Sequence, residues 1–136
     1  MKISIRKAIA YYGAVRNMKE AGVSAKGIKM LDLAMNKAKL EPIVVEFEQL
    51  KQSASEIIAG YNREISTALQ KDVGTINEKY KKELDDFEKA NKDLNATMDE
   101  EREIELITVK KSDLTIKEDN GGAAECLFGL LPCLAD

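Results

Sequence analysis

The sequence predicts a mainly α-helical fold built around a long antiparallel helical hairpin. Helix-forming sequence runs from about Ser24 to about Arg102 with one break, at Asp72–Thr75, and aromatic residues make up only 5% of the chain. A chain of 136 residues has room for one domain with a modest core. We therefore expect a single helical domain over residues 1–136, with an N-terminal helix at 1–22, hairpin helices at 24–71 and 75–102, and a β-hairpin with a C-terminal tail at 103–136.

The N-terminal segment has the apolar spacing of an amphipathic helix from Ile3 to Lys19. Apolar residues recur at intervals of three and four, which is the period of one helix face. They are Ile5, Ala8, Ile9, Tyr12 and Val15. Gly22 is a typical helix-ending residue, and Ser24 is a suitable N-cap for the next helix.

The first hairpin helix begins with a 3-4 alternation of apolar residues, which is typical of the seam of a left-handed helix pair. The alternating residues are Ile28, Leu31, Met35, Ala38, Pro42 and Val45. Pro42 has no N–H for the carbonyl four residues earlier, so a kink or break is expected near Leu40–Glu41. A second apolar stripe continues to Leu69, and we expect Gly60 to be tolerated within it.

The second hairpin helix is expected to start at a capping box formed by Thr75 and Glu78. Its apolar stripe is regular and contains one polar residue, Asn91, of the kind that fixes register or oligomeric state. We predict that this stripe forms an interface. The predicted interface residues are Leu84, Phe87, Asn91, Leu94 and Met98.

After Arg102 the apolar period changes to two, which favours extended structure. Lys110–Asp113 is turn-like and Leu114–Ile116 can return as a strand, so a small β-hairpin is predicted near residues 103–117. An isolated hairpin is only marginally stable, and this one must pack on helices or on a second copy. A further turn is predicted at Asp119–Gly122.

The tail Ala123–Leu134 predicts a short apolar helix that Pro132 ends or bends. We add its leucines, Leu127, Leu130 and Leu131, to the predicted interface. Cys126 and Cys133 are expected to be reduced and buried. On one helix they would lie about 10 Å apart, which is too far for a disulfide.

Charge is distributed unevenly along the chain. Residues 1–40 carry nine Lys or Arg and two acidic residues, whereas residues 41–136 carry twelve basic and twenty-two acidic residues. Such opposite segments can pair within a chain or between chains. Binding of nucleic acid phosphates by residues 1–40 is a weaker interpretation, because the basic residues are spread out and no RNA-binding motif accompanies them.

The residues needed for common enzymatic chemistry are missing. The chain has no histidine and only two cysteines, and it lacks a glycine-rich phosphate loop. Its many carboxylates are typical of the wet face of helices. We therefore predict no enzyme activity, no catalytic or metal-binding residues and no cofactor.

Two further features of the sequence are a tyrosine pair near an arginine and a short apolar stretch close to residue 136. Tyr11 and Tyr12, close to Arg16, can be read either as a stacking platform for a nucleotide base or as a part-buried tyrosine pair. The longest apolar stretch, Cys126–Ala135, is far shorter than the roughly 20 residues of a membrane span. No signal peptide is recognised, which favours the cytoplasm.

The order of segments resembles a group of small tailed-bacteriophage proteins of unknown function. The resemblance rests on helix, turn and strand signatures along most of the chain. These are the turn Ala21–Lys26 before Ile28–Leu31, Leu40–Pro42, Val45–Gln49, Tyr61, Asn91–Leu94, the acidic Glu100–Glu105, Leu114 and Leu130–Pro132. The resemblance implies a phage origin and a small helical interaction protein. It implies no catalytic residues.

Two functional hypotheses follow. The first is a non-enzymatic, phage-encoded interaction protein that serves as an assembly factor or virion accessory component. Such a protein would form a homo-oligomer and contact another protein, either in the cytoplasm of the bacterial host or in the virion. The alternative is an anti-defence protein that inhibits a bacterial defence system. It would bind a host protein or sequester a nucleotide near Tyr11, Tyr12 and Arg16.

Overall fold

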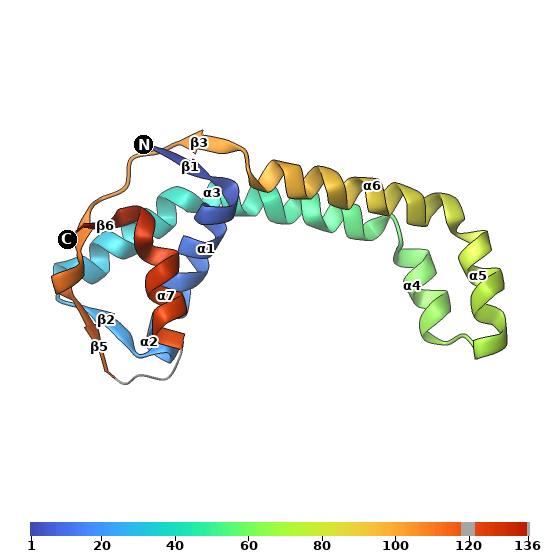
Figure 1. The fold of residues 1–136 in the computed structure, drawn as a ribbon, viewed down its shortest axis with the longest axis horizontal. Coiled ribbons are helices and arrows are strands. Elements are labelled where there is room, and N and C mark those ends of the chain that lie inside the picture. Colours follow the sequence, from blue (N-terminus) through green and yellow to red (C-terminus); the bar gives the residue numbers. More distant parts are fainter. Residues whose placement is uncertain (118–121, 136) are drawn as a thin grey trace. The chain divides into compact units, whose positions relative to one another are not determined.

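The computed structural model describes residues 1–117 and 122–135, and its fold is mainly α-helical, as predicted (Figure 1). The turn predicted at Asp119–Gly122 lies outside the described residues except for Gly122, which begins the last helix. The helices are α1 (Ile5–Arg16), α2 (Met18–Ala21), α3 (Ile28–Glu56), α4 (Ala59–Ser66), α5 (Val73–Lys79), α6 (Lys81–Met98) and α7 (Gly122–Leu130).

The chain divides into two compact units. One unit contains Met1–Val45 and Asp99–Asp136, and the other contains Glu46–Met98. The boundary between them falls inside α3. The second unit is therefore an insertion into the first.

Three two-stranded sheets join segments that are far apart in the sequence. Two pairs are antiparallel and one is parallel. The pairs are β1 (Lys2–Ser4) with β3 (Glu101–Glu103), β2 (Val23–Ala25) with β5 (Leu114–Ile116), and β4 (Val109–Lys110) with β6 (Leu134–Ala135).

The predicted β-hairpin near residues 103–117 is therefore wrong. Leu114–Ile116 is a strand and a 3-10 turn at Lys111–Asp113 precedes it, but this strand pairs with Val23–Ala25. Alternation with period two identifies an extended segment and says nothing about its partner. Because each strand is only two or three residues long, its stability comes from packing against the rest of its unit.

The predicted N-terminal helix is correct over its middle only. Lys2–Ser4 is a strand, Ser4 caps α1 by accepting a hydrogen bond from the Lys7 N–H at 3.1 Å, and the helix is interrupted at Asn17. Gly22 ends α2 with a φ of 74°, as a left-handed C-cap requires. A serine cap and the pairing of Lys2–Ser4 with β3 both favour a helix start at Ile5.

The hairpin helices differ from the prediction in two places. Of the kink or break expected near Leu40–Glu41, the break is absent, because helix α3 continues through Pro42, which lies on an exposed face together with Ala38. The continuous helix predicted up to residue 71 instead ends at Glu56, and the chain resumes as α4 at Ala59. The interruption falls at the β-branched pair Ile57–Ile58, which weakens a helix, whereas Gly60 lies inside α4 and is tolerated as expected.

The capping box predicted at Thr75 and Glu78 is not formed. Helix α5 begins two residues earlier, at Val73, so Thr75 lies inside the helix and the N-cap position is taken by Asp72. The chain turns instead over residues 67–72, which include a short 3-10 segment at Gln70–Asp72.

In the unit Glu46–Met98, helices α4 and α5 pack against each other. The rings of Tyr61 and Tyr80 meet edge to face with centroids 5.9 Å apart, and the Tyr61 hydroxyl donates to Asn77 Oδ1 at 2.8 Å. Lys79 Nζ lies 3.0 Å from Glu64 Oε1. Within this unit α6 runs back along the second half of α3, which is the predicted antiparallel arrangement (Figure 1).

The core of the other unit is formed where α1 packs on α7 and on the first half of α3. The buried face of α1 consists of Ile5, Ala8, Tyr11 and Ala14. The face predicted from the sequence is rotated around the helix axis relative to the observed buried face. The predicted face includes Tyr12 and Val15, and both are only half-buried. Fully enclosed side chains in this core include Ile3, Leu33, Leu40, Val109 and Leu130.

Candidate interaction surfaces

A buried polar cluster links α1, α3 and the C-terminal segments. Asn36 is fully buried, and its Nδ2 donates to the Tyr11 hydroxyl at 3.0 Å and to the Ile107 carbonyl at 2.9 Å. Its Oδ1 accepts from the Ile107 N–H at 2.7 Å. The Tyr11 hydroxyl donates in turn to Cys133 Sγ at 3.3 Å. Asn36 thus replaces the strand partner that Ile107 lacks.

Burial keeps the titratable members of this cluster neutral. It raises the pKa of Tyr11 well above its usual range, and the hydrogen bond to Cys133 acts in the same direction. Burial also raises the pKa of the Cys133 thiol and of the Cys126 thiol. Both cysteines are free and buried, as predicted. Neutral, shielded thiols are poor nucleophiles, so this cluster is a structural feature of the core.

The three residues considered for a nucleotide site do not form a shared stacking platform. Tyr11 is enclosed in the core. Tyr12 is half-buried beneath Lys37, whose Nζ lies 4.7 Å from the ring centroid in a cation–π contact, and Arg16 is exposed. A base stacking on this part of α1 would have access to Tyr12 but not to Tyr11.

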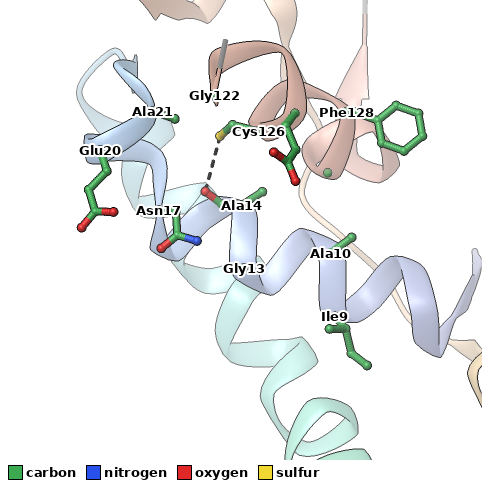
Figure 2. A pocket seen from close by; sticks show the side chains of 12 residues that line it. Ile9, Ala10, Gly13, Ala14, Asn17, Glu20, Ala21, Gly122, Cys126 and Phe128 are labelled. Atoms are coloured by element: carbon green, nitrogen blue, oxygen red, sulfur yellow. Dashed lines mark hydrogen bonds between the residues drawn. The ribbon is translucent and has the colours of Figure 1, made fainter. Parts of the chain in front are cut away.

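A hollow of about 520 Å³, open to solvent, lies between helices α1 and α7 (Figure 2). Its walls are small residues, among them Ala10 and Gly13 of α1 and Gly129 of α7, and Cys126 Sγ lies 3.4 Å from the Ala14 carbonyl oxygen. The helices approach closely because Gly129 has no side chain. Asn17, Glu20 and Glu125 also line the hollow, so its lining combines small apolar residues with an amide and two carboxylates.

Phe128 is the most exposed large apolar side chain among the described residues, with 73% of its surface accessible. It stands at the edge of the hollow in Figure 2 and also lines two others. One of these, of about 460 Å³, is almost entirely apolar and includes Ile116, Leu127 and Leu131. We call Ile116, Phe128 and Leu131 the α7 surface.

The predicted tail interface is only partly exposed. Leu131 is exposed and Leu127 is half-buried, but Leu130 is fully buried in the core of its own unit. Phe128 is not among the residues predicted for this interface. The signal was present, because Cys126–Leu131 contains no charged residue and a helix that is apolar all round cannot bury every side against one core.

Helix α3 presents a second exposed apolar surface, which we call the α3 stripe. It consists of the six residues with 3-4 spacing: Ile28, Leu31, Met35, Ala38, Pro42 and Val45. All six are exposed, and Ile28 and Leu31 have 69% and 56% of their surface accessible. The buried face of α3 lies on the opposite side and contains Leu33, Asn36, Leu40 and Val44. Half of this helix is therefore apolar on two opposite faces.

The predicted interface on α6 is less accessible than the α3 stripe. Leu84, Phe87, Leu94 and Met98 are half-buried within the unit Glu46–Met98. Asn91 is exposed, and the half-buried position beside it is Ala90. These apolar side chains are thus partly covered inside one chain, whereas the α3 stripe is not.

Comparisons with known proteins give no functional lead. No family model, no curated protein and no solved structure matches the chain. Within residues 1–117 and 122–135, no helix has both the length and the apolar character needed to cross a membrane. The same residues contain no group of three or more metal-ligating side chains in a suitable arrangement.

Proposed function

We propose that this chain is a non-enzymatic interaction protein that forms a homo-oligomer through helix packing. The observation that carries the proposal is the α3 stripe, an exposed row of apolar residues with the spacing of a coiled-coil seam. Such a row is stabilised when a second helix covers it. Neither the buried polar cluster nor the α1–α7 hollow presents an observation of similar weight in favour of catalysis.

The size of the stripe supports a weak dimer. Four of its side chains are large, and they are between 45% and 69% exposed: Ile28, Leu31, Met35 and Val45. Burying them in a contact between two stripes contributes about 6–13 kcal/mol at about 1.5–3 kcal/mol per fully buried side chain. Association costs about 4–15 kcal/mol, so the two contributions nearly balance. We therefore expect a dimer that dissociates on dilution.

We further propose that the protein is phage-encoded and serves as an assembly factor or virion accessory component in the bacterial host. The support is the resemblance in the order of segments to small tailed-bacteriophage proteins. Assembly factors and virion accessory components act by contact with other proteins, and the two exposed apolar surfaces of this small chain are suited to such contacts.

Native mass spectrometry of the purified protein tests the proposal. We expect a species of twice the 15.1 kDa chain mass, with a share that rises with protein concentration. Only the 15.1 kDa species at every concentration would contradict self-association. A dimer that retains an additional mass of a few hundred daltons would instead support the alternative in which the protein sequesters a nucleotide.

A further inference from the structure

We infer that the second copy packs antiparallel on the α3 stripe, across a two-fold axis between Met35 and Ala38, so that Asp32 of each copy faces Lys39 of the other. This inference rests on the proposed self-association. It adds the orientation of the two helices and the charged residues that select it.

Charged residues flank the stripe on both sides. Successive residues of a helix are rotated by about 100°, which places residues seven apart on nearly the same side. Asp32 and Lys39 therefore lie along one flank, and Ala34 and Glu41 along the other. In paired helices, the charges of residues on these flanks determine which helix binds and whether it binds parallel or antiparallel.

An antiparallel pair brings each flank against the same flank of the other copy. The stripe extends from Ile28 to Val45, and a two-fold axis through its middle pairs residues at equal distances from that point. Asp32 of one copy and Lys39 of the other then differ by about 3 Å along the helix axis, at about 1.5 Å per residue. The symmetry creates this contact twice.

The other flank is compatible with the same arrangement. Glu41 of one copy lies near Ala34 of the other, which is uncharged and small. The two Glu41 residues are then about 13 Å apart along the axis, which exceeds the screening length of about 8 Å at physiological salt. No close pair of like charges is forced on this flank.

A parallel pair fits these charges less well. It brings the Asp32 flank against the Glu41 flank of the other copy. Asp32 then has only the uncharged Ala34 beside it. Lys39 lies about 3 Å along the axis from Glu41, which is attractive, but Glu46 lies equally close to Glu48 and about 8 Å from Glu41. Like charges in this position oppose association.

Both charged residues remain available for a contact between copies. Asp32 lies 3.7 Å from Lys29 one turn earlier on the same helix, and Lys39 Nζ donates to the Glu105 carbonyl at 3.0 Å. Lys39 is exposed. The side chains of Lys29 and Asp32 are 34% and 17% exposed, so Asp32 reaches the other copy from a half-buried position beside the stripe. An ion pair one turn apart on one helix contributes only about 0.2–0.5 kcal/mol, so the bond with Lys29 does not prevent a contact with Lys39 of the other copy.

Mixing two charge-reversed variants tests the orientation. Asp32→Lys gives a chain with lysine at both positions, and Lys39→Asp gives a chain with aspartate at both. In an antiparallel homodimer of either variant both contacts are repulsive, whereas in the mixed dimer both are attractive. The readout is the share of mixed dimer in native mass spectra of an equimolar mixture.

We expect the mixed dimer to exceed its statistical share of one half. Each exposed pair contributes a factor of about 1.4–5, and four repulsive contacts in two homodimers are exchanged for four attractive ones. Asp85→Lys and Lys89→Asp provide the control, because they change the same charges on an exposed face of α6. Their mixture should give the statistical share.

The possible results separate the two proposals. A mixed dimer at one half in the Asp32→Lys and Lys39→Asp mixture, with a dimeric wild type, would overturn the antiparallel arrangement alone. A wild-type chain that stays monomeric would overturn the proposed function itself. Circular dichroism of each variant alone shows whether the charge change has altered the fold.

Discussion

Gly129 and Gly13 form a matched pair of helix glycines whose replacement by alanine should have opposite effects. A Cβ at Gly129 would lie 2.8 Å from Ala14 Cβ and 2.9 Å from the Ala10 carbonyl oxygen. A Cβ at Gly13 would meet no atom within 4 Å. Non-bonded carbon atoms prefer separations of about 3.5–4.0 Å, so only the first substitution pushes α1 and α7 apart.

The expected magnitudes follow from two contributions. Replacing glycine by alanine inside a helix stabilises it by about 0.5–1 kcal/mol. Forcing an extra carbon into a tightly packed contact costs about 1–3 kcal/mol. We therefore expect Gly13→Ala to raise the free energy of unfolding by about 0.5–1 kcal/mol. For Gly129→Ala the packing cost outweighs this gain, so we expect the free energy of unfolding to fall by up to about 2.5 kcal/mol.

Urea denaturation followed by far-UV circular dichroism measures both changes against the wild type. The difference between the two variants isolates the packing contribution, because the helix propensity change is common to both. If Gly129→Ala proved as stable as Gly13→Ala, the close packing of α1 on α7 through Gly129 would be refuted. A third variant, Gly129→Leu, should be destabilised further because its side chain is larger.

Two other predictions concern the buried polar cluster. Replacing Asn36 by Leu leaves the N–H and carbonyl of Ile107 without partners and should lower the free energy of unfolding by about 2–5 kcal/mol in urea titrations. Burial raises the pKa of Cys126, Cys133 and Tyr11, so the folded chain holds protons that the unfolded chain releases. The contribution of the two thiols to stability should be constant below pH 9.0, the ordinary thiol value, and fall above it with a limiting slope of about 1.4 kcal/mol per pH unit for each thiol. Each Cys→Ser variant should lose the slope of its thiol.

The sequence was sufficient to predict that the chain is mainly helical, but not to predict where each helix begins and ends or which face it buries. In the first half of α3, apolar residues lie on two opposite sides, so periodicity alone cannot choose between the stripe at Ile28 and Leu31 and the face at Leu33 and Leu40. On α1 the tyrosines at positions 11 and 12 are chemically identical. Only the presence of Asn36 and Cys133 in the core decides that Tyr11 is the buried one.

Contacts between distant segments were beyond prediction from local patterns. The strand Leu114–Ile116 was correctly predicted, but its pairing with Val23–Ala25 depends on how the whole unit closes. Asn36 gave no local signal of its role, because its bonds to Ile107 span 71 residues. The exposed Phe128 could have been inferred, since its helix is apolar on every side.

Sedimentation equilibrium of Leu31→Glu tests the central claim, self-association through the α3 stripe, most directly. Leu31 is exposed in the single chain, so the substitution should leave the fold intact while placing a charge in the proposed interface. Leu69→Glu is the control, because Leu69 is 62% exposed and lies in the unit Glu46–Met98. We predict that the wild type and Leu69→Glu dimerise with rising concentration and that Leu31→Glu stays at 15.1 kDa. A Leu31→Glu chain that dimerises as strongly as the wild type would contradict the account.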